Sequence, residues 1–438
     1  MILQKISEKL LKNILYWILI LLALIPGIYT SVTIYPFVTI KTILFRVVVG
    51  IMSIFYVALV LKNSNYLPKK SKLLLSFFVF LVTCILSGLI SLDKAQSFWS
   101  SPERVMGSYS MIFFFLFVFI ISSVFKTKKE WNSIFSWWNW GIAGSSLLSF
   151  IVFVANNLIA SRNIFDTRFQ GFTGNPIYFA AILLVFFFIN LYLFFEKVSQ
   201  NAKIKQLLPY IAIAILYIVF ILMSGTRGAL VALGITGFIL LTSLIANKSK
   251  ELEDIFKINF QKAALWTLIV IVSFAIAIFA LKDTRLIKSN YILFRLTNIN
   301  AKDNASFSRI VVSKIALDCF QEKPLTGWGF DNFEICFQQH FDQETSEMLP
   351  IEKRFDKTHN MPFEIMATNG LLGIIAFLGI YFFAYKYIRD AITNDKIYFY
   401  SGLSIILAIL VYFIQNLFVF DVFEGLLAIC LVFGFSAA

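Results

Sequence analysis

Residues 207–246 read LLPYIAIAILYIVFILMSGTRGALVALGITGFILLTSLIA, and this stretch decides the fold. Two apolar runs flank one polar turn, SGTRG at 224–228. An α-helix needs about 20 residues to cross the hydrocarbon core of a bilayer, and each run is close to that length. Burying an arginine at membrane depth costs about 2.5 to 3.5 kcal/mol even on a lenient insertion scale. The turn therefore belongs at a membrane surface, and the stretch predicts a transmembrane helical hairpin.

The composition extends this prediction to the whole chain. Of 438 residues, 59% are hydrophobic and only 14% are charged, against about 25% charged in soluble domains. Phenylalanine occurs 50 times, whereas Gly, Pro and Cys occur 20, 9 and 4 times, which excludes disordered, collagen-like and disulfide-scaffold proteins. The chain is expected to be an all-α integral membrane protein with about twelve transmembrane helices.

Apolar runs of membrane-spanning length locate the predicted helices. They cover roughly 14–30, 43–61, 73–91, 107–125, 131–155, 176–195, 207–223, 229–246, 263–281, 362–385, 399–417 and 421–437. Residues 1–281 thus hold nine spans, residues 282–361 form one large extracytoplasmic loop, and residues 362–438 hold three further spans. No convincing internal repeat supports the inverted-repeat architecture of transporters.

Basic residues predict the orientation of these spans. With the N-terminus inside, the inner segments hold about 20 of the 38 Lys and Arg residues, whereas the short outer connections hold about 7. Both termini are therefore expected in the cytoplasm. The net charge of +13 follows this topology and adds attraction to anionic membrane lipids, so the sequence gives no reason to expect a nucleic-acid partner.

The large loop is expected to contain an amphipathic helix. Val312, Ile315, Ala316, Cys319 and Phe320 recur at helical spacing, with polar residues between them. Pro324 and the glycines that follow it end the pattern. A disulfide between Cys319 and Cys336 is possible in an oxidising compartment, but the spacing does not decide it. No Cys/His spacing predicts zinc, and no outer Asp-x-Asp predicts a metal-diphosphate site, so neither metal nor cofactor is expected.

Several arginines lie where helices start on the outer side. Every even-numbered span runs from outside to inside, so the electropositive helix N-terminus faces outward and favours an anion. Arg227 opens the eighth span, and arginine suits a diphosphate because its guanidinium donates two parallel hydrogen bonds. The alternative without a binding function is a tight turn whose arginine lies at the membrane interface. Further candidates at predicted helix starts are Arg104, Arg168, Asn175, Arg309 and Asn360.

The chain has two histidines, His340 and His359. A lone loop histidine is most often a solvated or hydrogen-bonded residue, and His340 fits that description. His359 directly precedes the Asn360 helix cap, and a neutral imidazole can accept a proton from a hydroxyl nucleophile. His359 is therefore the candidate general base.

These motifs resemble the O-antigen ligase and O-antigen polymerase superfamily of bacterial membrane glycosyltransferases. The residues that carry the resemblance are SGTRG at 224–228, Arg309, PLTGWG at 324–329, His359-Asn360 and NGLLG at 369–373. Weaker similarities lie around Arg104 with Gly107 and around Arg168 with Asn175. Their order and spacing, rather than any one motif, make the resemblance specific from about residue 225 to residue 373.

The resemblance implies a metal-independent, inverting transfer of a glycan from a polyprenyl (undecaprenyl) diphosphate to a hydroxyl acceptor. The reaction would take place at the outer face of the bacterial cytoplasmic membrane, in lipopolysaccharide or other cell-surface polysaccharide synthesis. Arg227 and Arg309 would bind the diphosphate, and His359 would activate the acceptor or help hold the phosphates. Arg104, Arg168, Asn175 and Asn360 would assist in substrate binding.

Other functions remain open at this stage. The acceptor could be a lipid core, the growing glycan of a polymerase, or a protein. A lipid or solute transporter without chemistry is the alternative from another class. It predicts ionisable residues in mid-span, whereas the candidates here gather at the outer surface.

Overall fold

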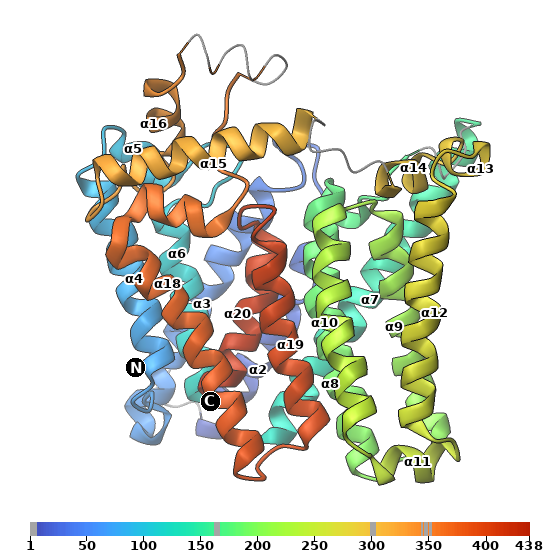
Figure 1. Ribbon diagram of the computed structural model, residues 1–438. Helices are drawn as coiled ribbons and strands as arrows, with labels where there is room; N and C mark the ends of the chain where they lie inside the picture. The colour runs from blue at the N-terminus through green and yellow to red at the C-terminus, as the bar shows by residue number, and fades with distance from the viewer. Residues whose placement is uncertain (1–6, 162–166, 298–303, 343–344, 346–348, 350–352) are drawn as a thin grey trace. The chain divides into compact units, whose positions relative to one another are not determined.

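The computed structural model describes residues 7–161, 167–297, 304–342, 345, 349 and 353–438. Two basic residues that enter the orientation count, Lys5 and Arg162, lie outside this part of the chain. Within it, every regular element is a helix and no strand occurs, which confirms the all-α class (Figure 1).

In the described part of the chain, nine helices are long and apolar enough to cross a membrane, and three apolar helices are shorter. The nine are α2 (Glu8–Leu22, continued by η1, Ile25–Gly27), α3 (Thr39–Lys62), α4 (Lys72–Leu89), α7 (Lys128–Ile159), α8 (Pro176–Ser199), α9 (Ile204–Met223), α10 (Arg227–Ala246), α12 (Phe260–Ala280) and α18 (Met361–Thr393). The shorter three are α6 (Ser108–Val124), α19 (Phe399–Gln415) and α20 (Phe423–Ala437). Every predicted span overlaps one of these helices, but twelve membrane crossings remain a prediction.

The chain forms two compact units, and two helices, α7 and α18, contribute residues to both. Unit 1 contains Met1–Trp138, Asn300–Tyr387 and Asn416–Ala438, and unit 2 contains Asn139–Ile299 and Ile388–Gln415. Short helices complete them: in unit 1 η2 (Ser64–Tyr66), α5 (Lys94–Trp99), α15 (Asn304–Glu322) and α16 (Phe333–Gln339), and in unit 2 η3 (Gly171–Thr173), α11 (Lys250–Phe256), α13 (Arg285–Lys288) and α14 (Tyr291–Thr297).

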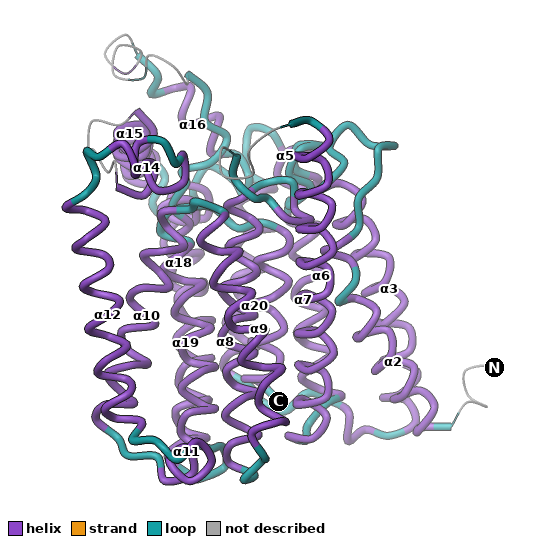
Figure 2. Tube along the Cα trace, turned by 90° about the vertical axis from the view of Figure 1, so that its right-hand side faces the viewer, coloured by secondary structure: helices purple, strands orange, loops and turns teal. Residues whose placement is uncertain are grey.

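In unit 1, α15 lies across the ends of the long helices, on the side where α5 and α16 also lie (Figure 1, Figure 2). We call this side the loop end of unit 1. The prediction of an amphipathic helix is confirmed, because Val312, Ile315, Ala316 and Cys319 of α15 are buried in one apolar cluster. A disulfide joins Cys319 to Cys336 of α16. The loop end is therefore a small folded cap with its own core.

Unit 2 is organised around α8. In the most apolar stretch of this helix, 83% of the residues are buried. This helix is apolar on all sides, as expected for a helix surrounded by other helices. Polar contacts add specificity: the Asn139 amide donates to Asn190 Oδ1 at 2.9 Å, and the Tyr217 hydroxyl donates to the Asn139 carbonyl at 3.0 Å. By contrast, only 6% of the residues in the corresponding stretch of α12 are buried, which suits a helix that faces lipid.

The orientation can be tested at the loop end. Asp342 is exposed, and all four native cysteines are protected, two by the disulfide and two by burial. We therefore expect the thiol of Asp342→Cys to react with a membrane-impermeant reagent in intact or outer-permeabilised cells. Lys250→Cys, on a predicted inner segment, is the matched control and should react only after lysis. The reverse pattern would overturn the orientation.

Candidate active site

Two sequence motifs meet at the loop end of unit 1. The PLTGWG turn at 324–329 docks on α18, where Trp328 and Gly329 donate backbone hydrogen bonds to the Ala367 and Thr368 carbonyls at 2.9 Å each. Gly327 has φ +66°, and a Cβ there would lie 2.2 Å from the Thr368 carbonyl carbon. Only glycine satisfies both constraints. The turn is thereby fixed on the helix that follows His359.

The same contact interrupts α18. Gly370 has a non-helical φ of 68° and ψ of −163°, and a Cβ at this position would lie 2.5 Å from the backbone of Leu325. The Leu371 amide donates to the Pro324 carbonyl at 2.7 Å rather than continuing the helical pattern. The Asn369-Gly370 motif therefore forms a kink that accommodates the PLTGWG turn.

The backbone around His359 is held by the cap of α18. Asn360 Oδ1 accepts from the Phe363 amide at 3.2 Å, and its Nδ2 donates to the Leu417 carbonyl at 3.1 Å. His359 itself has φ +56°, in the left-handed region that non-glycine residues rarely adopt. Such a conformation persists where surrounding contacts over-determine it. The imidazole therefore has a defined position, and the predicted cap at Asn360 is confirmed.

The hydrogen bond of the imidazole assigns its tautomer. Nδ1 lies 3.2 Å from the Lys357 carbonyl oxygen, which can only accept, so Nδ1 carries the proton and Nε2 carries the lone pair. The ring meets Phe420 edge-on, with centroids 5.2 Å apart. Burial lowers the pKa of His359 from its usual value, and the charges of Arg309 and Arg104 lower it further. The neutral form, which can accept a proton at Nε2, therefore predominates at neutral pH.

Arg104 is paired within unit 1. Its Nε and Nη2 donate to the two carboxylate oxygens of Asp356 at 2.8 and 3.2 Å, and its guanidinium lies over the Phe420 ring, 4.6 Å from the centroid. Burial raises the pKa of Asp356, but the hydrogen bond and charge of Arg104 outweigh it, so the pKa falls below its usual value. Asp356 is thus ionised at neutral pH and offsets the charge of Arg104.

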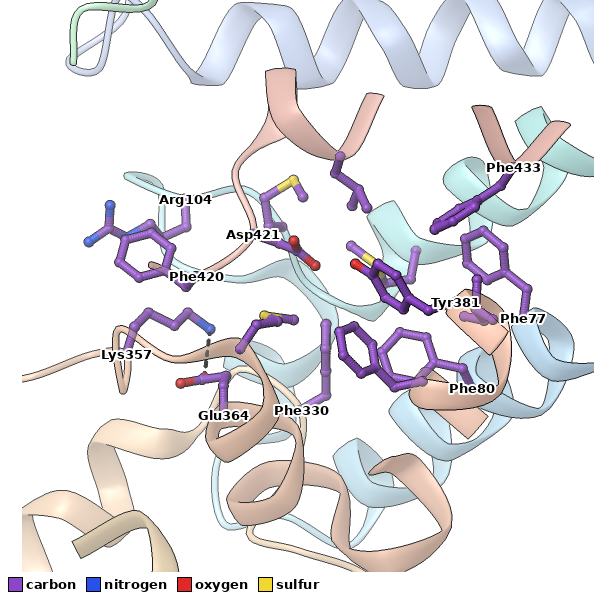
Figure 3. Close-up of a pocket in the computed structure, with 16 residues that line it drawn as sticks. Phe77, Phe80, Arg104, Phe330, Lys357, Glu364, Tyr381, Phe420, Asp421 and Phe433 are labelled. Carbon is purple, nitrogen blue, oxygen red and sulfur yellow. Dashed lines mark hydrogen bonds and ion pairs between the residues drawn. The ribbon is translucent and has the colours of Figure 1, made fainter. Parts of the chain in front are cut away.

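Lys357 links the His359 segment to two other elements. Its ammonium group bonds Asp331, just after the PLTGWG turn, and Glu364 of α18 at 3.2 Å (Figure 3). Burial lowers the pKa of Lys357, but the charges of Asp331 and Glu364 prevail and raise it above its usual value. The ammonium group is therefore charged. The Thr358 amide also donates to Glu364 Oε2 at 2.8 Å.

Unit 2 holds a second basic site around the SGTRG turn between α9 and α10. Arg168 donates to the Ser224 carbonyl at 2.7 Å and to Thr226 Oγ1 at 2.9 Å. Arg227 donates from Nε to the Arg295 carbonyl at 2.9 Å, and Arg295 donates from Nε to the Gly225 carbonyl at 3.3 Å. Three arginines from separate segments thus gather on one turn.

These arginines influence one another electrostatically. Burial lowers the pKa of Arg168 to about 10, and the positive charges of Arg295 and Arg227 contribute to the decrease, while Tyr291 opposes it. Arg168 nevertheless remains charged at neutral pH. Neighbouring like charges are unfavourable unless an anion joins them. The cluster is therefore suited to a ligand with more than one negative charge.

Comparison with known protein families gives a match over part of the chain. Residues 212–378 match the family model described as O-antigen ligase. The match supports the resemblance of this chain to the O-antigen ligase superfamily. No curated protein matches the chain. Together with its apolar helices, the match indicates a bacterial membrane protein of glycosyltransferase type.

The O-antigen ligase segment contains part of each site. Arg227 and Arg295 in unit 2, and Arg309 and His359 in unit 1, lie within residues 212–378, whereas Arg168 and the other earlier candidates precede the segment. Of the predicted residues, Arg168 and Arg227 come together in unit 2. Arg104, Arg309, His359 and Asn360 belong to unit 1.

One predicted placement changes in the structure, and another is retained. Arg309 was expected at the start of the loop helix, but α15 begins at Asn304, so Arg309 lies in its second turn, away from the free N-terminal amides. Its charge instead acts on His359. Asn175 caps α8, since its Oδ1 accepts from the Ile177 amide at 2.8 Å. Asn175 thus lies at a helix start as predicted, and its part in substrate binding stays a prediction.

The sequence did not identify Arg295, Lys357 or the acidic partners of the cations. Arg295 lies in the short helix α14, where no motif distinguishes it from the other basic residues of the large loop. The signal for Lys357 was its position two residues before His359. The bonds of Lys357 and Arg104 to their acidic partners depend on tertiary packing.

Proposed function

We propose that this protein is an O-antigen ligase-type glycosyltransferase of the bacterial cytoplasmic membrane, with both termini in the cytoplasm. It would transfer a glycan from a polyprenyl diphosphate to a hydroxyl acceptor at the extracytoplasmic face. The observation that carries the proposal is the group of Arg168, Arg227 and Arg295 on the SGTRG turn. A diphosphate supplies the multiple negative charge that such a group requires.

The arginines would assist departure of the leaving group. As the bond between the anomeric carbon and the phosphate oxygen breaks, its electron pair passes to the diphosphate. Guanidinium groups fixed by backbone carbonyls, as Arg227 and Arg295 are, stabilise the developing charge without reorganising. The guanidinium groups would provide the charge that a divalent metal supplies in other diphosphate sites, so we expect a metal-independent reaction.

His359 would act on the acceptor. Its Nε2 lone pair takes the hydroxyl proton while the hydroxyl oxygen forms the new bond to the anomeric carbon. An acceptor that attacks the face opposite the diphosphate inverts the anomeric configuration.

The proposal can be tested with purified protein in liposomes. We expect an undecaprenyl diphosphate-linked oligosaccharide to release undecaprenyl diphosphate when membranes from cells that lack the protein supply the acceptor. The glycan should appear on that acceptor at the same rate, with the anomeric configuration inverted, and EDTA should not change the rate. Polymerase activity would give elongated oligosaccharide on the carrier, and protein glycosylation would give protease-sensitive product. Movement of intact donor across the bilayer without release would identify a transporter and refute the enzyme.

A further inference from the structure

The disulfide at the loop end has a histidine beside it. Cys319 lies in the last turn of α15, and its partner Cys336 lies in α16, which packs against α15 (Figure 1). His340 follows Cys336 by four residues, about one helical turn, and its Nδ1 lies 3.4 Å from Cys336 Sγ. The two sulfurs and an imidazole nitrogen all lie within 4.8 Å of one another. Three side chains that bind transition metals therefore share one corner of the cap.

A carboxylate orients the imidazole. His340 Nε2 donates to Glu322 Oε1 at 3.0 Å, and Glu322 lies three residues after Cys319 at the end of α15. A metal-binding histidine almost always donates its second ring N–H to a carboxylate or carbonyl group, which directs the lone pair of the other nitrogen at the metal. Nδ1 also lies 3.0 Å from the Cys336 carbonyl oxygen, a contact that coordination would replace. The imidazole thus already has the outer partner of a metal ligand.

The backbone around these side chains is well fixed, and the corner is open to solvent on one side. Both cysteines are buried in the apolar cluster of the cap. Trp328 Nε1 donates to the Cys319 carbonyl at 3.0 Å, and the His340 amide donates to the Cys336 carbonyl at 3.2 Å. The side chains of His340 and Glu322 are 22% and 50% exposed. A metal ion can therefore reach the corner while the cap stays folded.

Zinc is the metal that fits this set of donor atoms. Zn²⁺ binds thiolate sulfur at about 2.3 Å and imidazole nitrogen at about 2.0 to 2.1 Å in a tetrahedron, so its ligand atoms lie roughly 3.5 to 3.8 Å apart. The Cα atoms of Cys319 and Cys336 are 6.1 Å apart, so side-chain rotation suffices to reach such distances once the two sulfurs are no longer bonded. Water fills the fourth position. The sequence spacing did not indicate this site, because 17 residues separate the cysteines and only the packing of α16 on α15 joins them.

We propose that this corner is a redox-switched zinc site, in which Cys319, Cys336 and His340 bind one Zn²⁺ when the disulfide is reduced. A protein dithiol is the reductant. It supplies two electrons and two protons, so the S–S bond breaks to give two thiols while the dithiol becomes a disulfide. Each thiol then releases its proton to solvent as its sulfur binds the metal. The ion holds α15 to α16 in place of the disulfide.

This zinc site is separate from the proposed transfer reaction. The oxidised protein keeps both sulfurs in the disulfide, so EDTA should still leave the transfer rate unchanged. A glycosyltransferase without the zinc site, and a zinc site in a protein without transferase activity, would each be recognised, because metal binding is measured with no donor or acceptor present.

Cobalt is a suitable probe, because tetrahedral thiolate coordination gives Co²⁺ intense visible absorption bands and Zn²⁺ displaces it. The full chain, purified in detergent without a histidine tag, is reduced with a phosphine and titrated with Co²⁺ and then with Zn²⁺. We expect one ion per chain in the reduced protein and none in the oxidised protein. Glu322→Gln should lower the zinc affinity about 10- to 100-fold, and loss of the ligand itself in His340→Ala should lower it further.

Matched controls use the other histidine and the other two cysteines of the chain. His359→Gln should bind Co²⁺ like the wild type, and so should the double variant Cys84→Ser/Cys430→Ser, because these free cysteines are not part of the cap cluster. Absence of thiolate bands in the reduced wild type would overturn the zinc site. Bands of unchanged strength and affinity in His340→Ala, or loss of the bands in His359→Gln, would place the metal elsewhere and also overturn it.

Alkylation of the wild type decides the matter if the double variant fails to fold. Added Zn²⁺ should slow the modification of Cys319 and Cys336 in the reduced protein, as measured by mass spectrometry of the alkylated peptides. Unchanged rates at both cysteines would overturn the assignment.

Discussion

Replacing His359 by Gln is expected to lower the transfer rate by about 10² to 10⁴, the usual contribution of a general base. Glutamine keeps a polar side chain of similar size but cannot take the acceptor proton. The fold should survive, because the cap bonds of α18 belong to Asn360 and Thr358. The measurement is turnover by purified variants together with their thermal unfolding temperatures. His340→Ala is the control and should cost little, since His340 pairs with Glu322 on the partly exposed α15–α16 cap.

The pH dependence gives an independent test of the same assignment. The base works in its neutral form, so activity should fall as the pH drops through the pKa of His359. Because burial and nearby arginines lower that pKa, the fall should begin at a lower pH than an exposed histidine would give. If the imidazole acts as a cation on phosphate, activity would instead rise on acidification. A loss on acidification that persists unchanged in His359→Gln would remove this residue from the mechanism.

Replacing Arg227 by Lys is expected to lower kcat/KM for the donor by about 10² to 10³, the range seen when one fixed donor to a developing charge is lost. Lysine retains the positive charge, but it lacks the planar guanidinium group that can donate two parallel hydrogen bonds. The arginine donates from Nε to the Arg295 carbonyl, and this bond fixes the plane of its guanidinium group. An ammonium group cannot both keep that bond and donate two parallel hydrogen bonds to a phosphate.

A matched control separates this effect from general disturbance. Arg389 is half-exposed, and it pairs with the adjacent Asp390, so Arg389→Lys should leave turnover unchanged. Arg295→Lys should behave like Arg227→Lys, because each arginine bonds the other segment. Near wild-type turnover in Arg227→Lys would show that this arginine only anchors the turn.

The sequence alone determined the helical architecture and indicated the resemblance to the O-antigen ligase family. Apolar runs such as 207–223 and 229–246 are local signals, because a helix in lipid must satisfy its backbone hydrogen bonds within its own segment. The period of α15 likewise fixed which of its residues face the core, as the buried Val312 and Ile315 confirm. Turn residues placed His359 ahead of a cap, because capping involves neighbours in the chain.

Only the tertiary structure decided which charges share a site. Arg104 meets Asp356 across 252 residues, and Arg227 meets Arg295 across 68. No periodic pattern connects such pairs, since their contact depends on how separate helices pack. The same packing buried Arg168 among like charges and paired Arg104 and Lys357 with carboxylates. The sequence therefore supplied the candidate residue types, and side-chain packing over long chain separations divided them between the arginine cluster on the SGTRG turn and the charge-compensated segment around His359.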